Sequence, residues 1–124
     1  MQITAEELRT LGDGATVLDV SKHQPAREIR GAVRYRPGDL LTPEHLALPI
    51  APDRPVVLYD EHGDAPATEQ IAEKMRADGF ADVRVLRGGA RAWKEAGGPT
   101  QEASTEQPVP PARPSQVQEL DRRI

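Results

Sequence analysis

The segment Asp60-Glu61-His62-Gly63-Asp64-Ala65 gathers reactive side chains at a position where many α/β proteins keep a functional group. It follows the apolar run "PVVLY" and precedes Pro66, a residue that suits the first turn of a helix. Its three carboxylates and one imidazole could bind a zinc or manganese ion, or provide an aspartate nucleophile. The segment has no serine, threonine, lysine or arginine, and the chain has no cysteine. A hydroxyl, thiol or amine nucleophile is therefore excluded from this segment.

The elements on either side of the segment are predicted from hydrophobic pattern. "PVVLY", residues 55–59, is the most apolar run and is typical of a central strand that is covered on both faces. A helix is expected from Pro66 to just before Gly79, with one apolar face made of Ala67, Ile71, Ala72 and Met75. The reactive segment is thus expected to be a turn between a buried strand and a helix.

Strands and helices alternate along the first hundred residues. Thr4 and Glu7 form a capping-box pattern that predicts a short opening helix, and the pair Thr42-Pro43 predicts a second one. Further strands are expected at "TVLDV", "AVRY" and "DVRVL", and a helix carrying Trp93 follows the last of them. This order predicts a three-layer α/β fold with a mostly parallel central sheet flanked by helices.

The sequence divides into three parts. Residues 1–100 form the expected domain, and residues 101–114 are a proline-rich linker with few apolar residues. Residues 115–124 predict a short C-terminal helix that needs a surface to dock on, with one apolar face made of Val117, Leu120 and Ile124. We expect this face to bind an unknown protein partner or to mediate self-association.

Charge and hydropathy exclude some classes of partner. The 20 acidic and 16 basic residues are interspersed and give a net charge of −4, so a nucleic-acid partner is not expected. No apolar run approaches the roughly 20 residues that span a bilayer, so we expect no membrane partner and a cytoplasmic location. No cofactor is expected.

The segments "TVLDV", "GAVRYRPGDL", "LPIAPDRPVVLYDEHG" and "ADGFADVRVLRGGARAWKEAGGP" together resemble a single-domain rhodanese over Ile3 to Pro99. In that family a cysteine directly after the central strand carries a persulfide, and a six-residue loop wraps it with backbone amides. The loop typically ends in an arginine that meets the sulfur donor. The resemblance places Asp60 at the cysteine position and Ala65 at the arginine position. The family's glycine-histidine-isoleucine-proline-glycine-alanine motif is matched only by "REIRGA", residues 27–32.

These replacements predict an inactive rhodanese-like domain that acts as a binding, scaffold or regulatory module. Sulfur transfer needs a thiolate, and a carboxylate cannot hold a persulfide. Asp60, Glu61 and Asp64 would also repel thiosulfate, which is a dianion. We interpret Asp60 as a structural plug whose carboxylate occupies the loop amides.

Three alternatives remain open at this point. The chain could be a degenerate enzyme that uses the acidic loop for another reaction, with or without a metal ion, and Asp60, His62 and Asp64 are the candidate metal ligands. The domain could present the thiol of a partner protein. Arg84, Arg87 and Arg91 could form a basic patch that pairs with Glu61 or Asp64, although a solvated face is the simpler interpretation.

Overall fold

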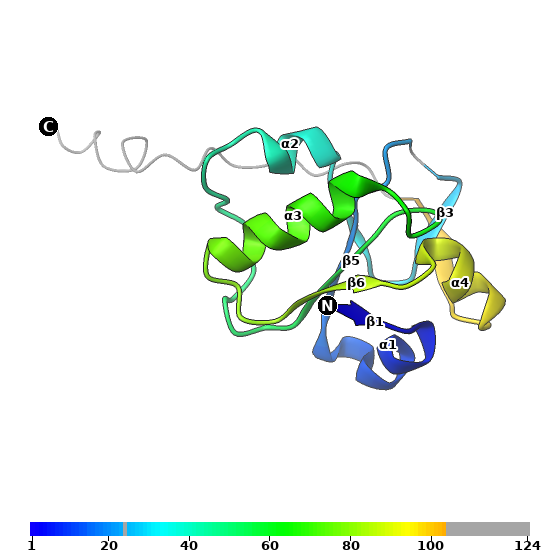
Figure 1. Ribbon diagram of the computed structural model, residues 1–124. Helices are drawn as coiled ribbons and strands as arrows, with labels where there is room; N and C mark the ends of the chain where they lie inside the picture. The colour runs from blue at the N-terminus through cyan, green and yellow to red at the C-terminus, as the bar shows by residue number, and fades with distance from the viewer. Residues whose placement is uncertain (24, 104–124) are drawn as a thin grey trace, which may run out of the picture.

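The computed structural model describes residues 1–23 and 25–103. It contains two sheets and four α-helices within these residues (Figure 1). In chain order the elements are β1 (Gln2–Ile3), α1 (Ala5–Leu11), the 3-10 turn η1 (Gly12–Gly14), β2 (Thr16–Asp19), β3 (Arg27–Ile29), β4 (Val33–Arg34), α2 (Pro37–Leu41), β5 (Val56–Tyr59), α3 (Pro66–Ala77), β6 (Val83–Leu86), α4 (Gly89–Glu95) and β7 (Thr100–Glu102).

The main sheet is parallel throughout and has the strand order β1-β6-β5-β2-β4. Strand β5 therefore lies in the centre, with β2 and β6 as its neighbours. All four of its residues are at most 1% exposed, as expected for an apolar strand covered on both faces. Because β5 ends at Tyr59, the reactive segment begins at the carboxyl edge of the central strand, where parallel α/β sheets commonly bind ligands.

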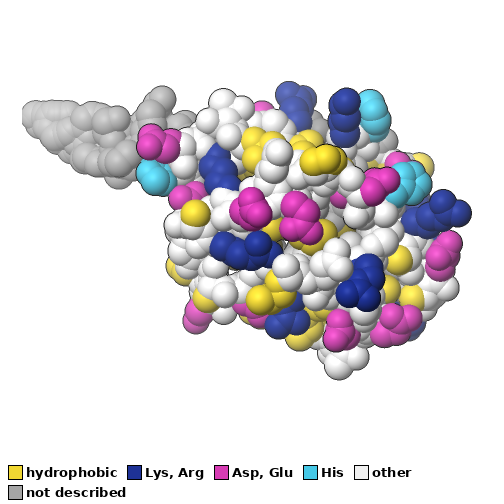
Figure 2. Space-filling model, in the orientation of Figure 1, with side chains coloured by type: hydrophobic (Ala, Val, Ile, Leu, Met, Phe, Trp, Pro, Cys, Tyr) yellow, Lys and Arg dark blue, Asp and Glu magenta, His cyan; other side chains and the backbone are white. Residues whose placement is uncertain are grey.

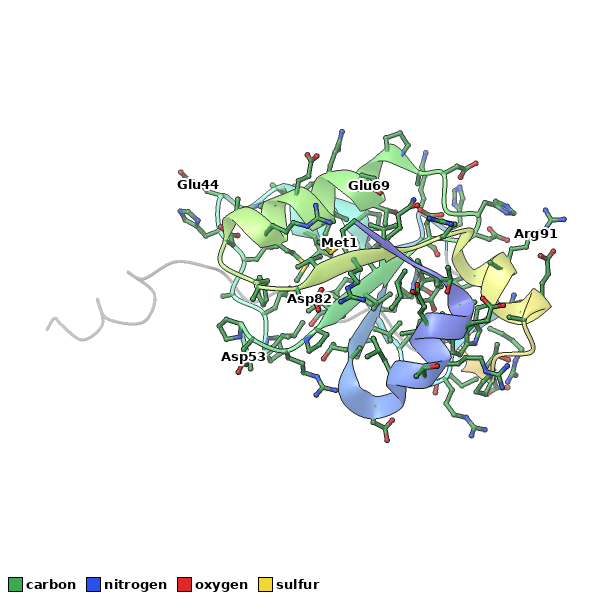
Figure 3. All side chains as sticks on the ribbon, turned by 60° about the horizontal axis from the view of Figure 1, so that its bottom comes forward. Met1, Glu44, Asp53, Glu69, Asp82 and Arg91 are labelled. Carbon is green, nitrogen blue, oxygen red and sulfur yellow. The ribbon has the colours of Figure 1, made fainter. Side chains whose placement is uncertain are left out.

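Helices cover both faces of this sheet and produce the three expected layers (Figure 1). Side chains alternate along β5, so Val56 and Leu58 pack with α2 and α3, including Leu40, Ile71 and Met75. Val57 and Tyr59 point to the other face and pack with α1 and α4, including Leu8 and Trp93. Helices α1 and α4 come forward together on that face in Figure 3.

The opening helix follows the prediction from its local sequence. Thr4 Oγ1 accepts a hydrogen bond from Glu7 N at 3.1 Å, and Thr4 N donates to Glu7 Oε1 at 2.9 Å. Both halves of the capping box are present, and the helix ends at Gly12, whose φ of 55° favours glycine. The predicted capping box is therefore confirmed.

A second helix was predicted to begin at Pro43, and this prediction is wrong. The helix α2 begins six residues earlier, at Pro37, and Thr42 is its C-terminal cap. The Thr42 hydroxyl donates to the Gly38 carbonyl at 2.7 Å, so it stabilises the end of a helix instead of the start of one. Both segments have proline preceded by a polar residue, so the local pattern alone could not decide between them.

The second sheet is an antiparallel ribbon of β3 and β7. It extends the paired structure to Glu102, past residue 100 where the domain was expected to end. Gln101 Nε2 donates to Glu28 Oε2 at 2.6 Å, and Gln101 Oε1 accepts from Gly31 N at 3.0 Å. The rest of the predicted linker and the predicted helix 115–124 lie outside the described residues.

Candidate functional site

The loop formed by residues 60–65, hereafter the acidic loop, joins the central strand to α3. Ala65 is the N-terminal cap of α3 and Pro66 is its first residue, as predicted from the sequence. Asp60 is 4% exposed, whereas Glu61, His62 and Asp64 are exposed. The loop therefore has one buried acidic side chain beneath a solvated rim.

The Asp60 carboxylate points inward and is held by the loop that it begins. Its Oδ1 accepts hydrogen bonds from the backbone amides of His62, at 3.1 Å, and Gly63. Its Oδ2 accepts from the amide of Ala65 at 3.4 Å, at the start of α3. Backbone amides at a helix N-terminus stabilise negative charge, so the carboxylate lies where an anion is favoured.

A fourth donor, Thr68, was missed in the sequence. Its hydroxyl donates to Asp60 Oδ2 at 2.6 Å, and Thr68 is 1% exposed. The only local signal in the sequence is a threonine in the first turn of a predicted helix. Such a threonine usually indicates a weak helix cap and does not indicate a partner for a buried carboxylate. With this contact, both carboxylate oxygens are engaged with protein donors and are turned away from solvent. A carboxylate held in this way is poorly placed to attack a substrate.

Helix α4 fixes the backbone of the acidic loop without using the Asp60 side chain. The Asp60 carbonyl accepts from Ala90 N at 2.9 Å, and the Glu61 carbonyl accepts from Arg91 N at 3.0 Å. A Cβ added at Gly89 would lie 2.2 Å from the Asp60 carbonyl oxygen, and one at Gly63 would lie 2.6 Å from Gly88 N. Both contacts require glycine, so the loop and α4 approach as closely as two backbones can.

The strand below the loop is anchored by a buried polar cluster. The Tyr59 hydroxyl donates to Asp19 Oδ2 at 3.1 Å and accepts from Ile29 N at 3.1 Å. Burial and the nearby Asp19 carboxylate raise the pKa of Tyr59 well above its ordinary value. Asp19 also pairs with buried Arg34, whose Nη1 lies 3.3 Å from Asp19 Oδ1. Tyr59 therefore stays protonated and ties β5 to β2 and β3 directly before the acidic loop.

The exposed rim does not assemble the alternative sites considered from the sequence. Within residues 1–23 and 25–103 no three potential ligands among His, Asp and Glu come together to hold a metal ion, and Asp60 is engaged with the loop amides instead of facing His62 and Asp64. The partners of that carboxylate among the described residues are the loop amides and the Thr68 hydroxyl.

The alternative in which Arg84, Arg87 or Arg91 pairs with the acidic loop is not observed among the described residues. Arg84 pairs with Asp82 at 2.9 Å, and Arg91 pairs with Glu95 at 3.3 Å. Arg87 donates to the Gln2 side chain at 3.1 Å. Arg91 points away from the sheet in Figure 3, in agreement with the solvated-face interpretation. Arg84 and Arg91 pair with acids two and four residues away in the chain, which needs little side-chain ordering, whereas the partner of Arg87 lies on the neighbouring strand β1.

Charges of both signs are interspersed on the face shown in Figure 2, as expected from the sequence. No helix within the described part of the chain has the length and apolar character required to cross a bilayer. The predicted docking residues Val117, Leu120 and Ile124 lie outside the described residues.

Comparison with known proteins agrees with this architecture. The family model of the rhodanese-like domain matches residues 4–96. The chain therefore belongs to the rhodanese-like domain family. The comparison with curated protein sequences found no match.

Solved structures give the same fold. The Alr3790 protein of Anabaena sp. is 28% identical to this chain, with 81% of each chain covered and a TM-score of 0.64. A thiosulfate sulfurtransferase of Pseudomonas aeruginosa is 22% identical over 81% of this chain and 19% of its own, with a TM-score of 0.63. SseA of Escherichia coli, a 3-mercaptopyruvate sulfotransferase, is 18% identical over 87% of this chain and 52% of its own, with a TM-score of 0.64. The last two structures are less than 25% identical to this chain, so they support a shared fold and nothing more.

Proposed function

We propose that this protein is a rhodanese-like domain without sulfurtransferase activity, and that its acidic loop serves as a recognition surface for a binding, scaffold or regulatory role. The observation that carries the proposal is the inward carboxylate of Asp60, which takes up the loop amides and the Thr68 hydroxyl. An internal carboxylate there leaves no soft nucleophile and fills the place that an anionic donor would need.

The resemblance to rhodaneses assigns Asp60 to the position of the sulfur-carrying cysteine and Ala65 to that of the donor-binding arginine. Both losses affect the same reaction. No cysteine elsewhere in the chain can replace the first, because the sequence contains none. The side chain of Ala65 offers no positive charge to hold a dianion, and exposed Glu61 and Asp64 oppose one.

The exposed rim supports the recognition half of the proposal. Glu61, His62 and Asp64 are solvent-exposed side chains on a backbone that α4 holds rigidly, and rigid loops with exposed polar groups suit protein recognition. The partner expected for such a rim has a basic surface, because complementary charge steers association.

The catalytic half of the proposal is tested with the purified chain, thiosulfate and cyanide. Thiocyanate formation should not exceed the protein-free blank. Turnover clearly above that blank in a preparation free of other sulfurtransferases would overturn it.

The recognition half is tested by comparing the proteins retained by the wild type, by Asp64→Lys and by Glu73→Lys. Glu73 is an exposed acid further along α3 and serves as a matched control for the change of charge. We expect a specific partner to be lost with Asp64→Lys and kept with Glu73→Lys. Equal retention by all three chains would remove the acidic loop from consideration as the recognition surface.

A further inference from the structure

A groove of about 320 Å³ opens between α1, the β3–β7 ribbon and α4. Its apolar lining comes from Leu8, Val17, Ile29, Trp93 and Pro99, and we call it the Trp93 groove. It contains no residue of the acidic loop, so an inference about it does not depend on the function proposed above. In Figure 3 the two helices that border it lie on the same face of the sheet.

We propose that the Trp93 groove is the docking site for this chain's own segment 115–124. The segment has three large apolar residues, Val117, Leu120 and Ile124, at the spacing of one helical face. A helix of ten residues is marginal in water by itself and is stabilised when such a face is covered. The groove supplies an apolar floor for that face.

The length of the chain between groove and segment permits this contact. The described residues end at Ala103, whose amide donates to the Ala26 carbonyl at 3.2 Å, at one end of the β3–β7 ribbon. Ile29 and Pro99, at the other end of that ribbon, line the groove. The ribbon is about 10 Å long at roughly 3.3 Å per residue. Residues 104–114 could span roughly 34 Å at the rise of about 3.1 Å per residue of a polyproline helix, so the segment reaches the groove with length to spare.

Charges at the groove and on the segment are complementary. The groove is bordered by the exposed side chains of Arg9, Asp13 and Arg30, and none of the three has an ion-pair partner within residues 1–23 and 25–103. On a helix, Asp121 would lie one turn after Val117, and Arg123 would lie one turn after Leu120. The apolar face of the segment is therefore flanked by one acidic and one basic side chain, and the groove, with two arginines and one aspartate, offers a partner of opposite charge to each. Such an arrangement favours one orientation of the segment over the other.

Two features of the sequence make the test specific. Trp93 is the only tryptophan, so its indole N–H gives a single indole resonance in an NMR spectrum, and this group lies beside the groove. The indole Nε1 donates a hydrogen bond to the Pro99 carbonyl at 2.8 Å. The chain has no cysteine, so Gln118→Cys carries a nitroxide label at one position, off the apolar face. The experiment measures how strongly the label broadens the Trp93 indole resonance and the body amides in the full chain.

Two further substitutions are compared in the labelled chain. Leu120→Glu places a charge on the apolar face of the segment and should prevent docking. The broadening measured in this variant is the reference value for a segment that is tethered to the body but not docked. Arg122→Glu introduces the same side chain away from that face and is the matched control. Both changes lie outside the described residues, so amides of the body away from the Trp93 groove should keep their wild-type positions in the unlabelled chains, which shows that the body is folded.

We expect broadening at Trp93 to be several-fold stronger in the labelled chain and in Arg122→Glu than in Leu120→Glu. It should not depend on protein concentration, and it should be absent when a labelled chain is mixed with an isotope-enriched unlabelled one. Equal broadening in all three labelled chains would overturn the proposal. Broadening in the mixed sample would assign the segment to a second copy. Broadening centred on a different groove, which is lined by Val33, Tyr35 and Ile50, would assign the segment to another face. Either result would also overturn it.

Discussion

At the scale of single residues, the side chain of Asp60 and its hydrogen bonds are the main feature of the acidic loop. Rhodanese chemistry depends on a thiolate that faces an incoming donor, whereas Asp60 is buried and accepts hydrogen bonds from three amides and one hydroxyl. These donors stabilise the carboxylate as part of the fold. The same interactions occupy both oxygens of the carboxylate.

Asp60→Ala should lower the free energy of unfolding by about 1–3 kcal/mol, because it leaves buried loop donors without their acceptor. Urea denaturation measures this change. The control is Asp64→Ala, which removes an exposed carboxylate and should stay within about 0.5 kcal/mol of the wild type. Equal stability of the two variants would show that the Asp60 contacts do not stabilise the fold.

At the scale of elements, the acidic loop is shaped by α4 as much as by its own residues. Gly89 has a φ of 64° and packs against the Asp60 carbonyl, so the turn before α4 and the loop after β5 form one unit. The backbone geometry of the loop therefore depends on this contact as well as on the side chains of the loop.

Gly89→Ala should destabilise the protein by at least about 1 kcal/mol, the typical cost of a strained left-handed residue alone. The added methyl group also collides with backbone atoms that cannot turn aside. Gly38→Ala is the control, because Gly38 lies in α2 with a negative φ and open space at its Cβ. Thermal unfolding compares the two variants. If Gly89→Ala were as stable as Gly38→Ala, the close contact between loop and α4 would be incorrect.

A pH-dependent contact links the end of α3 to the loop after α2. His45 Nδ1 lies 3.0 Å from Asp78 Oδ1, and the hydrogen bond and charge of Asp78 raise the pKa of His45. A raised pKa in the folded state means that the contribution to stability is full below the ordinary His pKa of about 6.5 and is lost as the pH rises through the folded value. The His45→Gln variant should therefore have a lower Tm than the wild type at acidic pH and the same Tm at alkaline pH. Added salt should reduce the difference at acidic pH. A difference that does not change with pH would contradict this assignment.

Much of the fold could be predicted from local sequence. The capping box of Thr4 and Glu7, the central strand and the helix from Pro66 depend on neighbouring residues, and the position of the acidic loop follows from them. The inward direction of the Asp60 carboxylate was predicted because a helix N-terminus favours an anion. The contribution of Thr68 was not, because it depends on the side of α3 that faces the loop.

The elements that were missed depend on distant pairing. Strands β1, β3 and β7 have two or three residues each and include charged or polar side chains, so they have no apolar pattern of their own. Residues of β3 pair with residues of β7 more than 70 positions later in the chain, as in the hydrogen bond from Gln101 to Glu28. Such a pairing becomes visible only in the folded chain.

At the scale of the whole molecule, the β3–β7 ribbon closes the fold over the buried cluster that supports the acidic loop. Glu28 and Arg34 are completely buried together with Asp19 and Tyr59, and Gln101 reaches this cluster from the last strand. The paired structure therefore includes Gln101 and Glu102, and we expect residues beyond position 100 to contribute to its stability.

Gln101→Ala should cost about 1–3 kcal/mol of stability, because buried Glu28 loses one of its donors. Glu102→Ala, an exposed change on the same strand, should be nearly neutral. Chemical denaturation of both variants measures the difference. Two equally mild effects would mean that β7 adds nothing to the domain.

The central claim is that the acidic loop retains the backbone of a rhodanese loop and lacks only its chemistry. Cyanide-dependent sulfur transfer from thiosulfate, measured for the wild type, Asp60→Cys, Ala65→Arg and the double variant, tests it most directly, provided that each chain is shown to be folded. Asp60→Cys should give a modifiable thiol with little transfer, since Glu61 and Asp64 repel the donor and Ala65 cannot hold it. Adding Ala65→Arg supplies a planar, permanently charged group for the donor oxygens, so the double variant should exceed the sum of the two single variants. A double variant no more active than Asp60→Cys would contradict the assignment of Asp60 and Ala65 to the two active positions of the family.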